Sequence, residues 1–138
     1  MSNAPIALVG AGEYLPVMTE IERALIDGRA PRYVQLATAA APEGEESLAR
    51  WHNLGRLQAE RLGVEQVVVD VRNRQDAQNE ELAALIEGAG LVYLSGGNPA
   101  FLADTLRDTR VWEAIVAAHE AGAAVAGCSA GAMALSSW

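Results

Sequence analysis

The stretch LVYLSGGNP, residues 91–99, decides the fold of this chain, because it combines the three local signals of a parallel α/β unit. The apolar run Leu91–Leu94 predicts a buried strand, and the glycines that follow predict a tight loop. Asn98 is a favoured helix N-cap, and Pro99 suits the first position of a helix. The stretch therefore predicts a strand, a loop and a helix in direct succession.

The same alternation continues along the whole chain. Short apolar runs predict strands at Ile6–Val9 and 33–36, within 64–71, and at Leu91–Leu94 and 123–126. Longer patterns with helical spacing predict helices at 16–26, Glu45–Leu62, 80–87, Pro99–Leu106 and 111–121. Polar loops are expected after the second and third strands. Strands separated by helices indicate right-handed crossovers and a parallel sheet. We predict one α/β domain over residues 1–138, a doubly wound, flavodoxin-like sheet in three α/β/α layers.

Composition narrows the classes of function. Hydrophobic residues make up 51% and charged residues 20% of the chain, as in ordinary globular proteins. Ten basic and eighteen acidic residues give a formal charge of −8, which disfavours nucleic acids and anionic membranes as partners. The single cysteine, Cys128, excludes an internal disulfide. No apolar run is long enough to span a membrane and no secretory signal is visible, so a cytoplasmic protein is expected.

Ligands of open parallel sheets bind beyond the carboxyl ends of the strands. Three such ends carry loops of interest, at residues 10–14, 95–98 and 127–131. In the first, Glu13 and Tyr14 are interpreted as ordinary loop residues, with pocket lining as the alternative. Leu15 stands where a dinucleotide-binding loop has its last glycine, so a dinucleotide is not expected. No grouping of His, Cys, Asp or Glu has metal-ligand spacing, and neither a metal nor another cofactor is expected.

The third loop, GCSAG at 127–131, matches the G-x-S-x-G pattern of a nucleophile elbow. Small neighbours allow the sharp turn from strand to helix, and the N–H groups of the new helix face the reacting oxygen. Ser129 is the candidate nucleophile; the alternative is that it only caps a helix. Cys128 is interpreted as a structural residue because the glycines frame Ser129. An amidotransferase-like enzyme acting through Cys128 stays open as an alternative.

Together, the GGN loop at 96–98 and the GCSAGA elbow at 127–132 resemble the dipeptidase E and cyanophycinase peptidases. These form peptidase family S51, which has the class I glutamine amidotransferase-like fold. The resemblance implies that Ser129 is the nucleophile and that the backbone N–H groups of Gly97 and Ala130 form the oxyanion hole. It also implies that Gly96 and Asn98 contact the substrate, a small aspartyl-containing dipeptide or cyanophycin-like peptide.

The triad is the point where the sequence departs from this family, whose base histidine and acid come later in the chain. Nine residues follow Ser129, and none of them is histidine or acidic. His52 and His119 are interpreted as surface or packing residues. The chain is therefore expected to be the N-terminal part of a longer peptidase-like domain, with the other triad members outside it. The alternative is a non-catalytic domain that binds a small molecule or a partner; a homodimer is left open.

Overall fold

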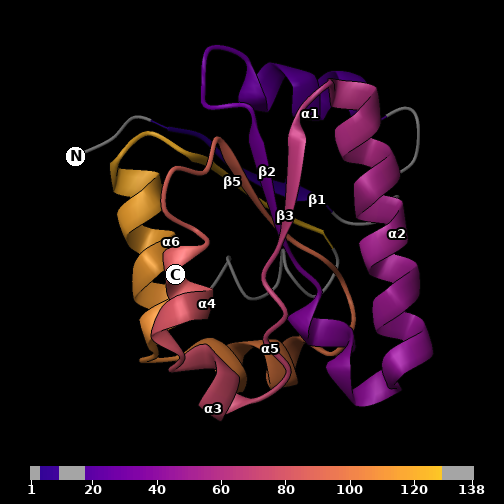
Figure 1. Cartoon of the computed structure of the whole chain (residues 1–138), viewed down its shortest axis with the longest axis vertical. Helices are drawn as coiled ribbons and strands as arrows, with labels where there is room; N and C mark the ends of the chain where they lie inside the picture. Colours follow the sequence, from indigo (N-terminus) through magenta and orange to yellow (C-terminus); the bar gives the residue numbers. More distant parts are fainter. Residues whose placement is uncertain (1–3, 10–17, 129–138) are drawn as a thin grey trace.

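A computed structural model describes residues 4–9 and 18–128 of the chain (Figure 1). Five parallel strands form one sheet in the order β1-β5-β4-β2-β3. The strands are β1 (Ile6–Val9), β2 (Arg32–Leu36), β3 (Glu65–Val68), β4 (Leu91–Leu94) and β5 (Ala124–Cys128). The helices are α1 (Met18–Ile26), η1 (Thr38–Glu43), α2 (Glu45–Leu62), α3 (Arg74–Ala77), α4 (Glu80–Ala84), α5 (Pro99–Leu106) and α6 (Arg110–Glu120). The predicted α/β fold with a parallel sheet is confirmed.

Helices cover the two faces of the sheet, with α2 on one side and α4 and α6 on the other (Figure 1). Val34 and Val92 point to the face on which Leu102 of α5 and Ile115 of α6 are buried. On the opposite face, the aromatic strand residues pack against the apolar sides of α1 and α2. Both faces are apolar because both are covered, which explains why the strand sequences do not alternate strictly. The fold therefore has the three expected layers.

Two segments expected as polar loops are wrong predictions. The one after β2 is the 3-10 helix η1, and its first half is buried, with Thr38, Ala39 and Ala40 almost inaccessible to solvent. The one before α4 contains the single-turn helix α3, whose N-cap Asn73 accepts a hydrogen bond from the Asp76 N–H at 2.8 Å. Pro42 and Gly44 favoured a loop at the first site, but tertiary burial of the alanines decides the outcome.

Several element boundaries also differ from the sequence prediction. Within the stretch 64–71 that was expected to contain a strand, β3 occupies Glu65–Val68, and α4 ends at Ala84 rather than at residue 87. Strand β5 extends two residues beyond the predicted end, to Cys128. Element ends are set by pairing and capping with distant segments, which local hydrophobic patterns do not record.

A buried carboxyl group joins α1 and α2 to the sheet. Glu22 is 1% exposed and accepts hydrogen bonds from the Tyr33 hydroxyl at 2.6 Å and from the Gln58 amide at 2.8 Å. Burial raises the pKa of Glu22 above its ordinary value, although both hydrogen bonds oppose this rise. The apolar helical pattern of α1 gave no sign that this acidic residue faces inward.

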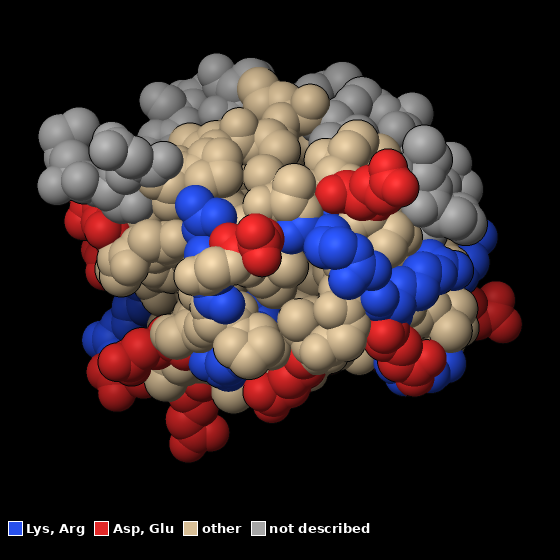
Figure 2. Space-filling model, turned by 90° about the horizontal axis from the view of Figure 1, so that it is seen from above, with Lys and Arg blue, Asp and Glu red and all other residues tan. Residues whose placement is uncertain are grey.

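At the edge of the sheet where the strands begin, arginine side chains cap the ends of helices. Seen from above, basic side chains gather there among acidic ones (Figure 2). Helices in this fold end at this edge and leave carbonyl groups without partners in the helix. Three arginines donate such bonds: Arg23 to the Arg61 carbonyl at 2.9 Å, Arg29 to the Leu25 and Gly122 carbonyls at 2.8 and 2.9 Å, and Arg32 to the Leu85 carbonyl at 3.2 Å and to the Glu87 carbonyl. These arginines therefore stabilise the fold through their own hydrogen bonds.

None of the helices in the described part of the chain combines the length and the apolar character needed to cross a bilayer.

We predict that Glu22→Gln changes how stability depends on pH. In the wild type, the raised pKa means that the folded state binds more protons than the unfolded state, so stability falls as pH rises above the ordinary value of 4.5. The neutral amide at position 22 removes this loss. The stability of the variant relative to the wild type should therefore increase from pH 4.5 to 8, as measured by denaturant unfolding at each pH. Glu20→Gln, exposed on the same helix, should show no such trend. A constant difference between Glu22→Gln and wild type would contradict this account.

Candidate active site at the carboxyl edge of the sheet

The ends of three neighbouring strands bring the candidate loops to one edge. Leu94 at the end of β4 pairs with Gly127 of β5 on one side and with Leu36 of β2 on the other. The Ser95 N–H extends the pairing by donating to the Leu36 carbonyl at 3.0 Å. The loop at 96–98 therefore begins between the ends of β5 and β2. Helix α5 leaves this loop toward one face of the sheet, and α2 follows β2 on the opposite face. Such a reversal marks the usual ligand crevice of open α/β sheets.

The Gly96-Gly97-Asn98 loop is fixed against the 3-10 helix η1. The Asn98 N–H donates to the Ala39 carbonyl at 2.8 Å. Gly97 has φ +148°, a conformation that residues with side chains rarely adopt, and a Cβ there would lie 2.3 Å from the Ala39 oxygen. Only glycine fits this position, because any side chain would displace the backbone of η1. Gly97 is thus required by a close backbone approach, which the sequence alone did not reveal.

The backbone N–H of Gly97 is the available donor of the loop. Gly96 is buried, whereas Gly97 is exposed. The Gly97 N–H makes no hydrogen bond to any residue in the part of the chain that the structure describes. A backbone amide of an exposed residue at the carboxyl edge, without a hydrogen-bond partner in the described part of the chain, is the kind of donor that an oxyanion hole requires.

Asn98 has the local role that the sequence predicts. Its Oδ1 accepts a hydrogen bond from the Phe101 N–H at 2.9 Å, and Pro99 follows as the first residue of α5. The N-cap prediction is confirmed. Asn98 is an exposed residue, and because the cap occupies Oδ1, Nδ2 is the side-chain group with which it would contact a ligand.

Helix η1 is itself held from the side of α2. Ala37 and Ala40 pack with Leu48 of α2, and Trp51 packs against this small cluster. Gly44, at φ +100°, makes the turn from η1 into α2. The Thr38 hydroxyl is buried and has no hydrogen-bond partner among the described residues. Residues 37–40 thus form a packed support for Gly97, which sequence reasoning missed because Pro42 and Gly44 close by favour a loop.

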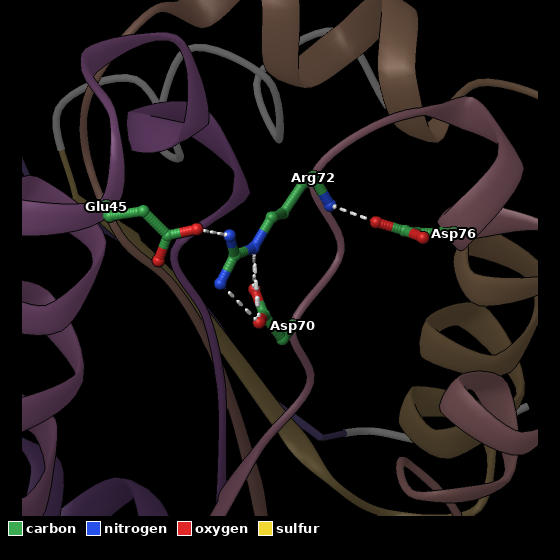
Figure 3. Close-up of polar contacts among 4 residues, drawn as sticks. All are labelled: Glu45, Asp70, Arg72 and Asp76. Carbon is green, nitrogen blue, oxygen red and sulfur yellow. Dashed lines mark hydrogen bonds and ion pairs between the residues drawn. The ribbon is translucent and has the colours of Figure 1, made fainter.

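A charged cluster lies at the same edge, beyond the end of β3 (Figure 3). Arg72 donates two parallel hydrogen bonds to Asp70, from Nε to Oδ1 at 3.0 Å and from Nη2 to Oδ2 at 2.9 Å, and it also binds Glu45. Its backbone N–H donates to Asp76 at 3.0 Å. The hydrogen bonds that Arg72 donates to Asp70 and then to Glu45 raise the pKa of Arg72. With two carboxylates on one guanidinium, the cluster joins the β3 loop to the start of α2 and does not attract a further anion.

The two histidines lie away from the Gly97 loop. His52 is half-buried in α2, and its carbonyl accepts a hydrogen bond at 2.8 Å from Gln66 of the outer strand β3. Burial lowers the pKa of His52. His119 of α6 contacts the carbonyl of Ala4 at 2.8 Å through Nε2, close to the amino end of β1 and therefore at the opposite edge of the sheet. These positions fit the packing roles that the sequence suggests.

Several residues of interest lie outside the described part of the chain. These are Ser129, Ala130, Glu13, Tyr14 and the glycines of residues 10–12. Cys128 is the last residue of β5, where it pairs with Val9, but its side chain is not described. Of the predicted elbow, the structure therefore describes only residues 127 and 128, at the end of β5.

Comparisons with known proteins agree with this fold. The model of peptidase family S51 matches residues 9–137. A crystal structure of a peptidase from an acI-B1 actinobacterium superposes with a TM-score of 0.87 at 45% identity, over 91% of this chain and 54% of that one. A crystal structure of a peptidase E protein from Listeria monocytogenes EGD-e superposes with a TM-score of 0.66 at 24% identity, over 91% of this chain and 58% of that one. At this identity the match shows the fold alone. The chain thus spans about half the length of both structures. Comparison with curated proteins gives no match.

We predict that Gly97→Ala is more harmful than an equivalent change elsewhere. Gly122 also has a positive φ, +114°, but a Cβ there meets nothing within 4 Å. Gly122→Ala should therefore cost only the backbone strain, about 1–3 kcal/mol. Gly97→Ala adds a clash with the Ala39 carbonyl and should lower the free energy of unfolding further, as measured by chemical denaturation. Equal losses in the two variants would show that Gly97 and η1 are not in tight contact.

Proposed function

The chain belongs to peptidase family S51, and from this premise we propose that it carries the nucleophile and the oxyanion hole of a serine-type peptidase. Ser129 is the proposed nucleophile, and the N–H groups of Gly97 and Ala130 are the proposed oxyanion donors. The observation that carries the proposal is the N–H of the exposed residue Gly97, which lies at the edge where β5 ends and makes no hydrogen bond within the described part of the chain.

Chain connectivity supports the pairing of Ser129 with Gly97. Gly127 pairs with Leu94, and neighbouring strands lie about 4.8 Å apart. Ser129 follows Cys128 directly, so its Cα is about 3.8 Å from that of the last residue of β5. On the neighbouring strand, Gly97 is three residues beyond Leu94. The two groups are therefore tethered to adjacent strand ends by short links.

The proposed reaction is acyl transfer. A general base takes the proton of the Ser129 hydroxyl while Oγ attacks the carbonyl carbon of the peptide bond. The carbonyl oxygen becomes an oxyanion and accepts hydrogen bonds from Gly97 and Ala130. One such donor contributes about 10²–10³ to the rate. The C–N bond then breaks, the amine leaves with the proton from the base, and water hydrolyses the acyl-enzyme.

The general base and its acidic partner are assigned to polypeptide beyond these 138 residues. His52 lies over the outer strand β3, and His119 is at the amino edge of the sheet. Neither position adjoins the end of β5. The chain also spans about half the length of the solved structures that it matches, which leaves room in such proteins for both groups.

The proposed substrates are small peptides that contain an aspartyl residue, either dipeptides or cyanophycin-like peptides. This part rests on the resemblance of the 96–98 and 127–132 motifs, with Gly96 and the Nδ2 of Asn98 as substrate contacts. The proposal places the activity in the cytoplasm and requires no metal or other cofactor.

We predict that a fluorophosphonate probe labels Ser129 in a suitable fusion protein. The fusion joins residues 1–138 to the part of the actinobacterial peptidase that has no counterpart in this chain. Ser129→Ala should abolish labelling, because the probe needs an activated hydroxyl, and intact-mass spectrometry measures the adduct. The control Cys128→Ala should retain it. Loss of labelling in Cys128→Ala alone would instead support a cysteine enzyme, and no labelling of a folded fusion would favour a non-catalytic binding domain.

The same fusion tests the substrate class. Dipeptides with an amino-terminal aspartate should be hydrolysed at least about 10-fold faster, by kcat/KM, than matched dipeptides with asparagine, since a site built for one charged partner rejects its neutral analogue. Amine release measured for both series decides the point. Equal rates would contradict aspartyl specificity while leaving the serine mechanism standing.

A further inference from the structure

Two glutamine side chains of the sheet form hydrogen bonds with the backbone of α2. Gln35 of β2 is fully buried, and its Nε2 donates to the Trp51 carbonyl of α2 at 2.8 Å. Gln66 of β3 donates to the Gln35 Oε1 at 3.0 Å and to the His52 carbonyl at 2.8 Å. Two neighbouring strands thus hold two consecutive carbonyls of one helix. Such bonds are directional, so they fix the position of α2 along the strands more closely than apolar contacts do.

Helix α2 carries a glycine at the point where the Gln35 side chain meets it. A Cβ at Gly55 would lie 2.1 Å from the Gln35 Oε1, so no larger residue fits without displacing this amide. In an α-helix the carbonyl of residue 51 pairs with the N–H of residue 55, so the glycine and the bonded carbonyl belong to the same turn. Glycine is unfavourable in a helix interior. Its presence within Glu45–Leu62 is explained by the space that Gln35 requires.

The same turn of α2 adjoins the support of Gly97. Trp51 packs against the cluster formed by Ala37, Ala40 and Leu48. On the other side of η1, a Cβ at Gly97 would lie 2.3 Å from the Ala39 oxygen and 2.8 Å from the Ala40 nitrogen. A continuous chain of contacts therefore runs from Gln35 through Trp51 and η1 to Gly97.

We propose that Gln35 is a positioning residue for the oxyanion donor Gly97: it fixes α2, α2 fixes η1, and η1 sets the place of the Gly97 amide. This role rests on the proposed function, because it concerns the same reaction. A misplacement of about 1 Å costs up to about 10²-fold in rate. The hydrogen bond from Gly97 to the oxyanion forms fully only in the transition state. Loss of its position therefore lowers kcat and leaves KM nearly unchanged.

The other half of α2 supplies a matched control residue. Gln58 is also fully buried; it donates to Glu22 at 2.8 Å and accepts hydrogen bonds from Thr19 at 3.3 Å and from Arg61 at 3.1 Å. It follows Trp51 by seven residues, which is about 10 Å along the helix axis. Its partners belong to α1 and to α2 itself, so the loss of Gln58 weakens the fold without acting on η1.

The test compares Gln35→Met with Gln58→Met in the fusion protein, because methionine is close to glutamine in length and has no hydrogen-bond donor. Gln35→Met should lower kcat for an amino-terminal aspartyl dipeptide about 10-fold, with KM within about 2-fold of the wild type. It should also speed hydrogen exchange of the Asn98 amide at least about 5-fold, because the bond of this amide to Ala39 opens more often. Gln58→Met should lower the free energy of unfolding but leave kcat and this exchange within about 2-fold of the wild type.

Other kinetic results overturn the positioning role. Equal losses of kcat in Gln35→Met and Gln58→Met would assign the effect to stability in general. A wild-type kcat in Gln35→Met would also refute the role, whether or not the Asn98 amide exchanges faster. A raised KM with unchanged kcat would contradict it too, because that result indicates lost substrate binding and not a displaced oxyanion donor.

A second variant serves if Gln35→Met does not fold. Gln66→Met removes the bond to the Gln35 Oε1 and leaves the bond from Gln35 to Trp51. It should lower kcat by a smaller factor, and a wild-type kcat would refute the positioning role. If the folded wild-type fusion neither reacts at Ser129 nor hydrolyses peptides, the proposed function fails, and exchange of the Asn98 amide decides the rest. Exchange in Gln35→Met that is no faster than in Gln58→Met refutes the role of Gln35, and faster exchange retains it for the loop.

Discussion

The hydrogen bond from the Asn98 N–H to the Ala39 carbonyl is the constraint on which the candidate site depends. It joins the loop after β4 to the buried start of η1, and the contact of Gly97 with Ala39 leaves no room for a side chain. This bond uses the Asn98 backbone amide, so within the described part of the chain the N–H of the exposed residue Gly97 is the backbone donor of the loop without a partner. These contacts together fix the conformation of the loop.

The sheet topology explains why this loop is part of the candidate site. Strand β4 lies between β5 and β2, so the loop after β4 has the candidate elbow on one side and η1 on the other. Helix η1 is fixed in turn by Leu48 and Trp51 of α2, and the Arg72 bridge ties the first residue of α2 to the loop after β3. The contacts that fix Gly97 thus extend from η1 through α2 to the loop after β3. The amino edge, where arginines cap helix ends, serves stability in a comparable way.

The sequence predicted the elements whose signals are local. The Leu91–Leu94 run, the Asn98 cap and the full extent of α2 are found as expected, because each depends on neighbouring residues alone. It did not predict η1, which is buried through contacts with α2 and α5, or the inward position of Glu22, whose partners are 11 and 36 residues away. At the site, the glycine pattern pointed to Gly97 as a backbone donor, and this assignment stays a prediction. The reason for glycine there, the contact with Ala39, is a tertiary fact without a local signal.

The most direct measurement is a crystal structure of the fusion protein with a phosphonate bound covalently to Ser129. Our account predicts a phosphoryl oxygen at about 2.7–3.1 Å from the Gly97 nitrogen, with the Asn98–Ala39 hydrogen bond intact. A phosphoryl oxygen directed away from the loop, with Gly97 still making no hydrogen bond to the adduct, would contradict the central claim.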